Sequence, residues 1–279
     1  MRIDAHQHVW TLARGDYGWL TPALGAIHRD FGPADLKPLL DAARIDRTIL
    51  VQAAPTLAET EFMLGVAAAT PFVAGVVGWV DMESADASAR IARLARNPLL
   101  VGLRPMIHDI ADPDWMLSAS LAPAIAAMQR HDLVFDALVR PVHLSRLLTF
   151  ADRHPGLSIV IDHGAKPDIA GRTLDPWRAD MAAMAARPNV ACKLSGLVTE
   201  AGIDWTDDDL RPVVSHLIAC FGASRLIFGS DWPVVTLAAP YQRWINTAEV
   251  LTGHLNADER AAIFGGTAER IYLSRPGRL

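Results

Sequence analysis

The chain has 279 residues, of which 51% are hydrophobic and 20% charged, so it is long and apolar enough to bury a large core. Its net charge of −5 argues against a general nucleic-acid binder, which needs an excess of basic residues. No apolar run reaches membrane-spanning length. The two cysteines, Cys192 and Cys220, lack the spacing of a zinc ribbon or a disulfide framework. With no signal peptide visible, these features predict a cytoplasmic protein without nucleic-acid or membrane partners, and they leave a homo-oligomer open.

The first predicted strand, residues 3–8, ends in the pair His6 and His8. In a β-strand, residues i and i+2 point to the same face, so both imidazoles could converge on one metal ion or substrate. Asp4 has the same parity and is expected one layer deeper. There it would either hold an imidazole tautomer or pair with a buried cation.

Short apolar runs then alternate with longer helical patterns along the chain. The eight runs cover residues 3–8, 48–52, 73–80, 99–104, 133–138, 158–163, 190–195 and 225–231. The helical patterns cover residues 35–44, 57–69, 84–96, 122–131, 143–153, 176–187, 207–221 and 241–251, with a final helix over 256–272. Eight strand–helix units predict a single-domain (β/α)8 TIM barrel over residues 1–279. A doubly wound sheet would have fewer strands and a glycine-rich phosphate turn, which is absent from the sequence.

The connection over residues 9–33 is longer than a usual strand-to-helix loop. It carries the aromatic residues Trp10, Tyr17 and Trp19 as well as His28. This aromatic content favours an ordered lid over the mouth of the barrel.

Polar residues gather where the predicted strands end, which is the face that carries the chemistry of barrel enzymes. Burying so many polar groups is costly unless they satisfy one another, a metal or a ligand. In chain order they are His6, His8, Gln52, Trp79, Asp81, Arg104, His108, Asp162, His163, Lys193, Ser195 and Asp231.

Four of these residues, His6, His8, His163 and Asp231, form a candidate metal site. Three imidazoles and one carboxylate suit a single divalent ion, with zinc the first choice. Each member also has a plainer interpretation: Asp231 could cap the turn in its FGSDWP segment, and His163 could be an ordinary core histidine.

Several motifs together resemble the sugar-lactonase branch of the amidohydrolase superfamily, a group of metal-dependent TIM-barrel hydrolases. They are IDAHQHVW, VGLRP, DPDW at 112–115, IDHGAKP, NVACKLSGL, RLIFGSDWPV and GGTAERIY, and the resemblance covers residues 1–273. It implies a (β/α)8 fold and the opening of a lactone of the L-fuconolactone or L-rhamnonolactone kind. The family histidine pair falls on His6 and His8, its later metal-site histidine on His163, its final aspartate on Asp231, and its arginine on Arg104.

The chain departs from the two-metal members of this superfamily at two positions. Arg104 stands where a bridging lysine or glutamate would be, and Lys193 stands where a later histidine would be. The resemblance therefore implies one divalent metal ion at most, and related lactonases differ in whether they need it.

The resemblance also implies a mechanism and a small-molecule sugar lactone as the partner. Asp231 is expected to deprotonate the water that attacks the lactone carbonyl and then to return the proton to the leaving alkoxide. The three histidines, with or without a metal, would polarise the carbonyl, and Arg104 would donate hydrogen bonds to the substrate. For Arg104 and Lys166 a purely structural ion pair or a solvated position is an equal alternative. Further contacts to the sugar are expected from His28, Gln52, Trp79, His108 and Lys166.

Two other functions remain open at this stage. An amidohydrolase-type, non-oxidative decarboxylase of a small carboxylic acid would share the fold and the His6–His8 start. A non-catalytic binding barrel would keep the fold alone, but the intact set of buried polar residues argues against it.

Overall fold

In the computed structural model, which describes residues 1–274, eight parallel strands pair in the order of the chain. They are β1 Ile3–Gln7, β2 Arg47–Val51, β3 Val73–Gly78, β4 Leu100–Leu103, β5 Val134–Ala137, β6 Ile159–Ile161, β7 Val190–Leu194 and β8 Leu226–Phe228. The sheet curls back on itself, because His8 N–H donates to the Trp232 carbonyl and Asp231 N–H donates to the His6 carbonyl, both at 2.7 Å. Each strand lies inside or within one residue of a predicted run.

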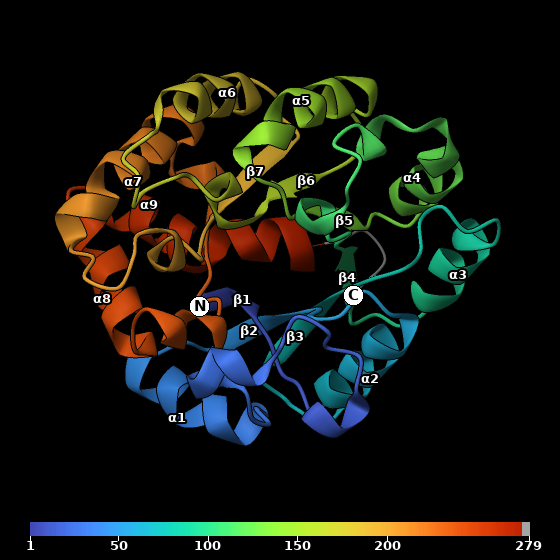
Figure 1. Cartoon of the computed structure of the whole chain (residues 1–279), viewed down its shortest axis with the longest axis horizontal. Coiled ribbons are helices and arrows are strands. Elements are labelled where there is room, and N and C mark those ends of the chain that lie inside the picture. Colours follow the sequence, from blue (N-terminus) through green and yellow to red (C-terminus); the bar gives the residue numbers. More distant parts are fainter. Residues whose placement is uncertain (275–279) are drawn as a thin grey trace.

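A helix follows each strand, and together these helices form a ring around the sheet (Figure 1). They are α1 Pro33–Ala43, α2 Leu57–Ala68, α3 Ala87–Leu94, α4 Ala122–Arg130, α5 Leu144–Arg153, α6 Asp175–Ala185, α7 Asp207–Phe221 and α8 Tyr241–Leu251. Local sequence fixes several helix starts: the Thr56 side chain accepts a hydrogen bond from Glu59 N–H at the start of α2. The predicted (β/α)8 barrel is confirmed.

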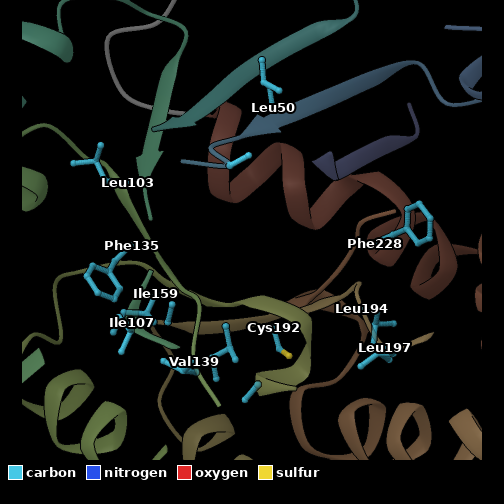
Figure 2. Packing of buried hydrophobic residues seen from close by; sticks show 14 of the residues in the cluster. Leu50, Leu103, Ile107, Phe135, Val139, Ile159, Cys192, Leu194, Leu197 and Phe228 are labelled. Carbon is cyan, nitrogen blue, oxygen red and sulfur yellow. The ribbon is translucent and has the colours of Figure 1, made fainter. Parts of the chain in front are cut away.

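Alternating strand residues build two apolar layers, as expected for a sheet buried on both faces. One layer takes a residue from every strand, including Ala5, Val77 and Ile227, and fills the barrel interior. The other lies between strands and helices, where Leu103, Phe135 and Phe228 point away from the barrel centre (Figure 2).

The predicted final helix over residues 256–272 is confirmed in extent, because helical structure runs from Ala257 to Leu273, but the helix is kinked. Its start is confirmed, because Asn256 and Glu259 form the expected capping box of α9, Ala257–Ala261. Beyond it the backbone widens over Ala262–Gly266 and departs from helical geometry at Gly265. The physical reason is packing, since a Cβ at Gly265 would clash with the carbonyl of Met1. The C-terminal segment thereby crosses the amino-terminal ends of the strands and leaves their carboxyl ends open (Figure 1).

The loop over residues 9–33 is ordered and lies against the barrel, as predicted; we call it the lid loop. Tyr17 donates its hydroxyl hydrogen to Glu59 Oε2 at 2.8 Å, and Trp19 donates its indole N–H to the Ala53 carbonyl at 2.7 Å. Among the helices of residues 1–274, none combines the length and the apolar character that crossing a bilayer requires.

Candidate active site

A local irregularity in β1 sets the position of the histidine pair. The register against β2 shifts between Asp4 and Gln7, as at a β-bulge. Because of this shift, Ala5 packs in the barrel interior, Gln7 donates outward to the Thr48 hydroxyl, and His6 and His8 both reach Asp231. The pair therefore meets on one side, as the spacing predicted.

The same irregularity makes the prediction for Asp4 wrong, because Asp4 no longer shares the parity of the histidines. Within residues 1–274, its carboxylate neither touches an imidazole nor pairs with a buried cation. Instead, Oδ1 accepts hydrogen bonds from the backbone N–H groups of Ser230 and His6, at 2.8 and 3.2 Å, and Oδ2 accepts from the Tyr241 hydroxyl at 3.1 Å. Asp4 thus fastens β1 to the segment that carries Asp231.

The four predicted metal-site residues come together at the carboxyl ends of β1, β6 and β8. Asp231 Oδ1 lies 3.3 Å from His8 Nε2, 3.6 Å from His6 Nε2 and 3.9 Å from His163 Nε2. One ligand atom from each of His6, His163 and Asp231 lies within 4.8 Å of the others. All four residues are buried.

The hydrogen bonds around His8 show that this group fits a cation. His8 Nδ1 lies 2.8 Å from the Val51 carbonyl, which can only accept, so the proton of a neutral ring is on Nδ1. The lone pair of Nε2 then faces the carboxylate oxygen of Asp231 at 3.3 Å. Two lone pairs at this distance repel unless a proton or a metal lies between them. Ligand atoms each about 2.1 Å from a zinc ion are at most about 4.2 Å apart, which all three distances to Asp231 satisfy.

His163 and Asp231 both depend on unusual backbone beyond their strands. His163 lies in the short turn Asp162–Ala165 with a φ of 54°, and Asp231 has a φ of 60°. Gly196, at a φ of +57°, makes room for the imidazole, because a Cβ there would clash with the His163 ring. The Ser195 hydroxyl, 2.9 Å from His163 Nδ1, holds the ring in place.

The predicted strand over 225–231 is too long, since β8 ends at Phe228 and Asp231 lies in the turn after it.

A network of buried charged residues contacts His6, and one of them, Asp136, was not among the predicted site residues. Lys193 Nζ is 2.5 Å from Asp136 Oδ2 and 3.0 Å from Asp162 Oδ1, with all three side chains fully buried. Arg104 Nη1 lies 3.3 Å from Asp162 Oδ2. The sequence did offer a sign of Asp136: it is the one charged residue of the otherwise apolar β5, and a buried carboxylate requires a partner.

His6 meets this network through its second ring nitrogen. His6 Nδ1 lies 3.2 Å from Lys193 Nζ and 3.4 Å from Asp162 Oδ1. If Nδ1 accepts from the ammonium, the ring proton is on Nε2 and faces Asp231. If Nδ1 donates to Asp162, Nε2 carries a lone pair that can bind a metal or accept from Arg104 Nη1, which lies 3.4 Å away. The network therefore controls which of the two roles His6 takes.

Burial and neighbouring charges set the ionisation of the group. Burial lowers the pKa of both His6 and His163 well below the ordinary value, so both imidazoles are neutral near pH 7. For Asp231 burial acts to raise the pKa, but His163, His8 and Lys166 outweigh it and leave the pKa below its ordinary value. The site thus pairs neutral imidazoles with an ionised carboxylate.

A cavity of about 230 Å³, the catalytic cavity, opens onto this group. Of the predicted substrate contacts, Arg104, His108 and Lys166 line it, and Lys166 also pairs with Glu200 at 2.8 Å. The remaining lining residues are Trp19, Ala53, Met106, Asp109, Leu138 and Val234. Trp19 could have been predicted as a substrate contact, because it lies in the loop expected to cover the mouth of the barrel.

Three of the predicted substrate contacts do not line the catalytic cavity. Gln52 is buried, and its side-chain amide donates to the Arg104 carbonyl at 2.9 Å, while the Arg104 guanidinium donates to the Gln52 carbonyl. Gln52 thus positions Arg104. Trp79 lines an adjoining cavity, and His28, which follows the short turn Pro22–Ile27, lines neither of the two.

Comparison with known proteins identifies the family of this chain. A sequence model of the family described as Amidohydrolase matches residues 3–273. A protein from Burkholderia ambifaria named L-fucono-1,5-lactonase is 52% identical, with 99% of this chain and 97% of that protein covered. Another L-fucono-1,5-lactonase, from Burkholderia multivorans, is 40% identical, with 98% and 96% covered.

Solved structures give the same assignment. A crystal structure of an amidohydrolase from Burkholderia multivorans with bound zinc superimposes with a TM-score of 0.93 at 39% identity. The superposition covers 98% of this chain and 99% of that one. With the family match over nearly the whole chain, the fold and these relatives, the protein belongs to the amidohydrolase family.

Proposed function

We propose that the protein hydrolyses a sugar lactone, L-fucono-1,5-lactone or a close relative of it, to the open-chain aldonic acid. The observation that carries this proposal is the ionised Asp231 among three histidines, at the wall of a cavity of about 230 Å³. The names of the two relatives at 52% and 40% identity support the substrate class.

In the proposed mechanism Asp231 is the general base. Its carboxylate takes a proton from a water molecule, and the water oxygen forms a bond to the lactone carbonyl carbon. The acyl carbon–oxygen bond of the ring then breaks, and Asp231 returns the proton to the departing alkoxide. One carboxylate thus serves as base and then as acid.

Cationic and polar side chains of the catalytic cavity orient the lactone in this proposal. The Arg104 guanidinium, held by Asp162 and the Gln52 carbonyl, presents fixed donors for the carbonyl oxygen. His108 and Lys166 line the same cavity and supply hydrogen-bond partners for ring hydroxyls.

A single divalent ion, zinc first, fits the donor set His6, His8, His163 and Asp231. When bound, such an ion acts as a Lewis acid that polarises the carbonyl or the attacking water. The carboxylate and Arg104 keep the roles given above in either case.

A panel of lactones tests the proposal. Sugar 1,5- and 1,4-lactones, including L-fucono-1,5-lactone, are assayed with a pH indicator, with and without chelator, beside a set of hydroxylated aromatic acids. The proposal expects acid release from one group of sugar lactones. Carbon dioxide release from an aromatic acid, with no lactone opened, would establish the decarboxylase alternative. No turnover of any lactone, ester or amide would favour the binding barrel.

A further inference from the structure

A second cavity, of about 510 Å³, adjoins the catalytic cavity, and we call it the distal cavity. The two share Trp19, Met106 and Asp109 in their walls. The residues that line the distal cavity include segments that follow β2, β3 and β4, such as Pro55, residues 79–83 and residues 105–106. These strands lie on the side of the barrel that α2 and α3 cover (Figure 1). It therefore extends the site on the same face of the barrel.

The two volumes indicate a site made for more than one sugar ring. Pockets that bind small molecules measure about 300–1,000 Å³. The catalytic cavity, at about 230 Å³, falls below that range, and the distal cavity, at about 510 Å³, falls within it. A lactone of one sugar in the catalytic cavity leaves the larger space free.

The distal cavity is lined by aromatic rings, including Trp79 and Trp115, which offer flat apolar surfaces of the kind that sugar rings stack on. Six of the eight tryptophans donate their indole N–H to an acceptor in the protein. Trp79 makes no such hydrogen bond within residues 1–274 and is only partly buried. Its ring and its N–H are therefore available to a ligand.

Four carboxylates, those of Asp16, Asp81, Glu83 and Asp109, also line the distal cavity, and no lysine, arginine or histidine does. Carboxylate oxygens accept hydrogen bonds from hydroxyl groups and repel anions. Asp16 Oδ1 is buried and accepts no hydrogen bond within the described residues. These features favour a ligand rich in hydroxyl groups and exclude a carboxylated or phosphorylated one.

Two of these carboxylates already have partners within the protein, which favours a neutral ligand over a cation. Asp16 pairs with Arg14 at 2.6 Å. Glu83 accepts hydrogen bonds from Trp115 Nε1 and Ser120. The Asp81 carboxylate is open to a ligand, since Asp81 is exposed and accepts one backbone hydrogen bond, from Glu83 N–H.

From these observations we infer that the distal cavity binds a neutral sugar unit joined to the lactone by a glycosidic bond. The substrate class is then the lactone of a disaccharide acid, with its lactone ring in the catalytic cavity. Water opens the acyl carbon–oxygen bond of that ring, and the glycosidic bond stays intact. This inference rests on the proposed lactone hydrolysis.

The test compares L-fucono-1,5-lactone with three lactones that carry a galactosyl unit on O2, O3 or O4, made by oxidising disaccharides that end in L-fucose. One variant, Gly18→Phe, narrows the distal cavity, because Gly18 lines it and has open space for a Cβ. A second, Asp81→Ala, removes the open carboxylate. Gly65→Phe is the matched control, since Gly65 is an exposed glycine of α2 that also has open space.

We expect the wild type to hydrolyse at least one galactosyl lactone with a kcat/KM equal to or above that of L-fucono-1,5-lactone. Gly18→Phe should lower kcat/KM for that substrate at least tenfold, Asp81→Ala several-fold, and Gly65→Phe not at all. None of the three should change kcat/KM for L-fucono-1,5-lactone.

Three results would overturn the inference while leaving the proposed function intact. The first is efficient hydrolysis of L-fucono-1,5-lactone with none of the galactosyl lactones accepted. The second is an equal effect of Gly18→Phe on both substrate classes. The third is inhibition of the monosaccharide reaction by choline but not by galactosyl fucitols, which would mark a cation site. Failure to open any sugar lactone would instead refute the proposed function.

Discussion

Lys193 is the central cation of the buried charged network that contacts His6. It is fully buried and lies between the carboxylates of Asp136 and Asp162, while Tyr272 donates its hydroxyl hydrogen to Asp136 at 2.8 Å. Burial alone would lower the pKa of Lys193, but the two carboxylates raise it above the ordinary value, so the ammonium is charged. Removing one member of such a group leaves the other charges buried without a partner.

We therefore expect Lys193→Met to lower the free energy of unfolding by about 3–5 kcal/mol. Adding Asp136→Asn should recover part of this loss, because it removes the carboxylate that the ammonium of Lys193 had neutralised. Urea unfolding of the single and double variants measures both effects. A loss below about 1 kcal/mol, or no recovery in the double variant, would show that the charges are not coupled as described.

The four-residue group should also bind zinc. Adding zinc to metal-stripped protein is expected to raise the melting temperature, because a ligand that binds only the folded state at 100 times its Kd stabilises it by about 2.7 kcal/mol. His163→Ala removes one imidazole and should abolish most of this rise. Thermal unfolding with and without zinc, beside elemental analysis, measures the effect. No rise in the wild type, with full activity after chelation, would assign the histidines to hydrogen bonding alone.

At the residue scale, the sequence predicted those parts of the site that follow from the spacing of residues along the chain. The His6–His8 pair and the polar ends of distant strands pointed to the group that meets at Asp231. Asp4 was mispredicted because the irregularity in β1 follows from packing against β2 and β8, and counting residues cannot show it. Asp136 was missed because its partner, Lys193, lies two strands away in the sheet.

At the scale of elements, the lid loop is fastened through Glu59, a buried residue of α2. Glu59 Oε2 accepts from the Tyr17 hydroxyl, and Oε1 accepts from Ala53 N–H at 3.1 Å. Burial raises the pKa of Glu59 from 4.5 to about 7, against the lowering effect of these hydrogen bonds and of Arg14. Folding therefore favours the protonated side chain, and the lid loop is attached through a group that titrates near neutrality.

This shift has a definite sign. A carboxyl with a raised folded pKa contributes stability that is fully present below pH 4.5 and is lost as the pH rises to about 7. Glu59→Gln cannot ionise; its amide oxygen can still accept from Ala53 N–H, and its amide N–H can donate to the Tyr17 hydroxyl oxygen. We expect the variant to gain stability relative to the wild type as the pH rises from 5 to 7.5, and no further above that. Urea midpoints across this range measure the difference, and a constant difference would contradict the argument.

The C-terminal segment shows which features of a helix its local sequence can predict and which depend on contacts with distant residues. Its capping box predicted where α9 begins, but the kink at Gly265 coincides with a close contact with Met1, which is distant in sequence. Gly265→Ala should lower the free energy of unfolding by about 1–3 kcal/mol, as expected for overpacking. Gly65→Ala, at an exposed site of α2 with open space for a Cβ, is the comparison for urea unfolding. An equal effect of the two substitutions would show that the contact with Met1 has no special weight.

At the scale of the whole molecule, the alternation of short apolar runs with helical patterns was sufficient to predict the barrel. Parallel strands buried on both faces give continuous apolar runs, and each run corresponds to one strand. Closing the barrel then brings the ends of β1, β6 and β8 together, because all eight carboxyl ends lie at one rim. The division of the open face into two cavities could not be predicted, since it depends on how the lid loop packs over the strands.

The measurement that tests the account most directly is the steady-state hydrolysis of L-fucono-1,5-lactone by Asp231→Asn, with Asp258→Asn on the exposed α9 as the control. Asparagine keeps the shape of the side chain and cannot accept the proton of water, so kcat should fall by about 10²–10⁴-fold while the melting temperature stays near that of the wild type. Turnover by a folded Asp231→Asn variant at the rate of the wild type would contradict the central role of this carboxylate.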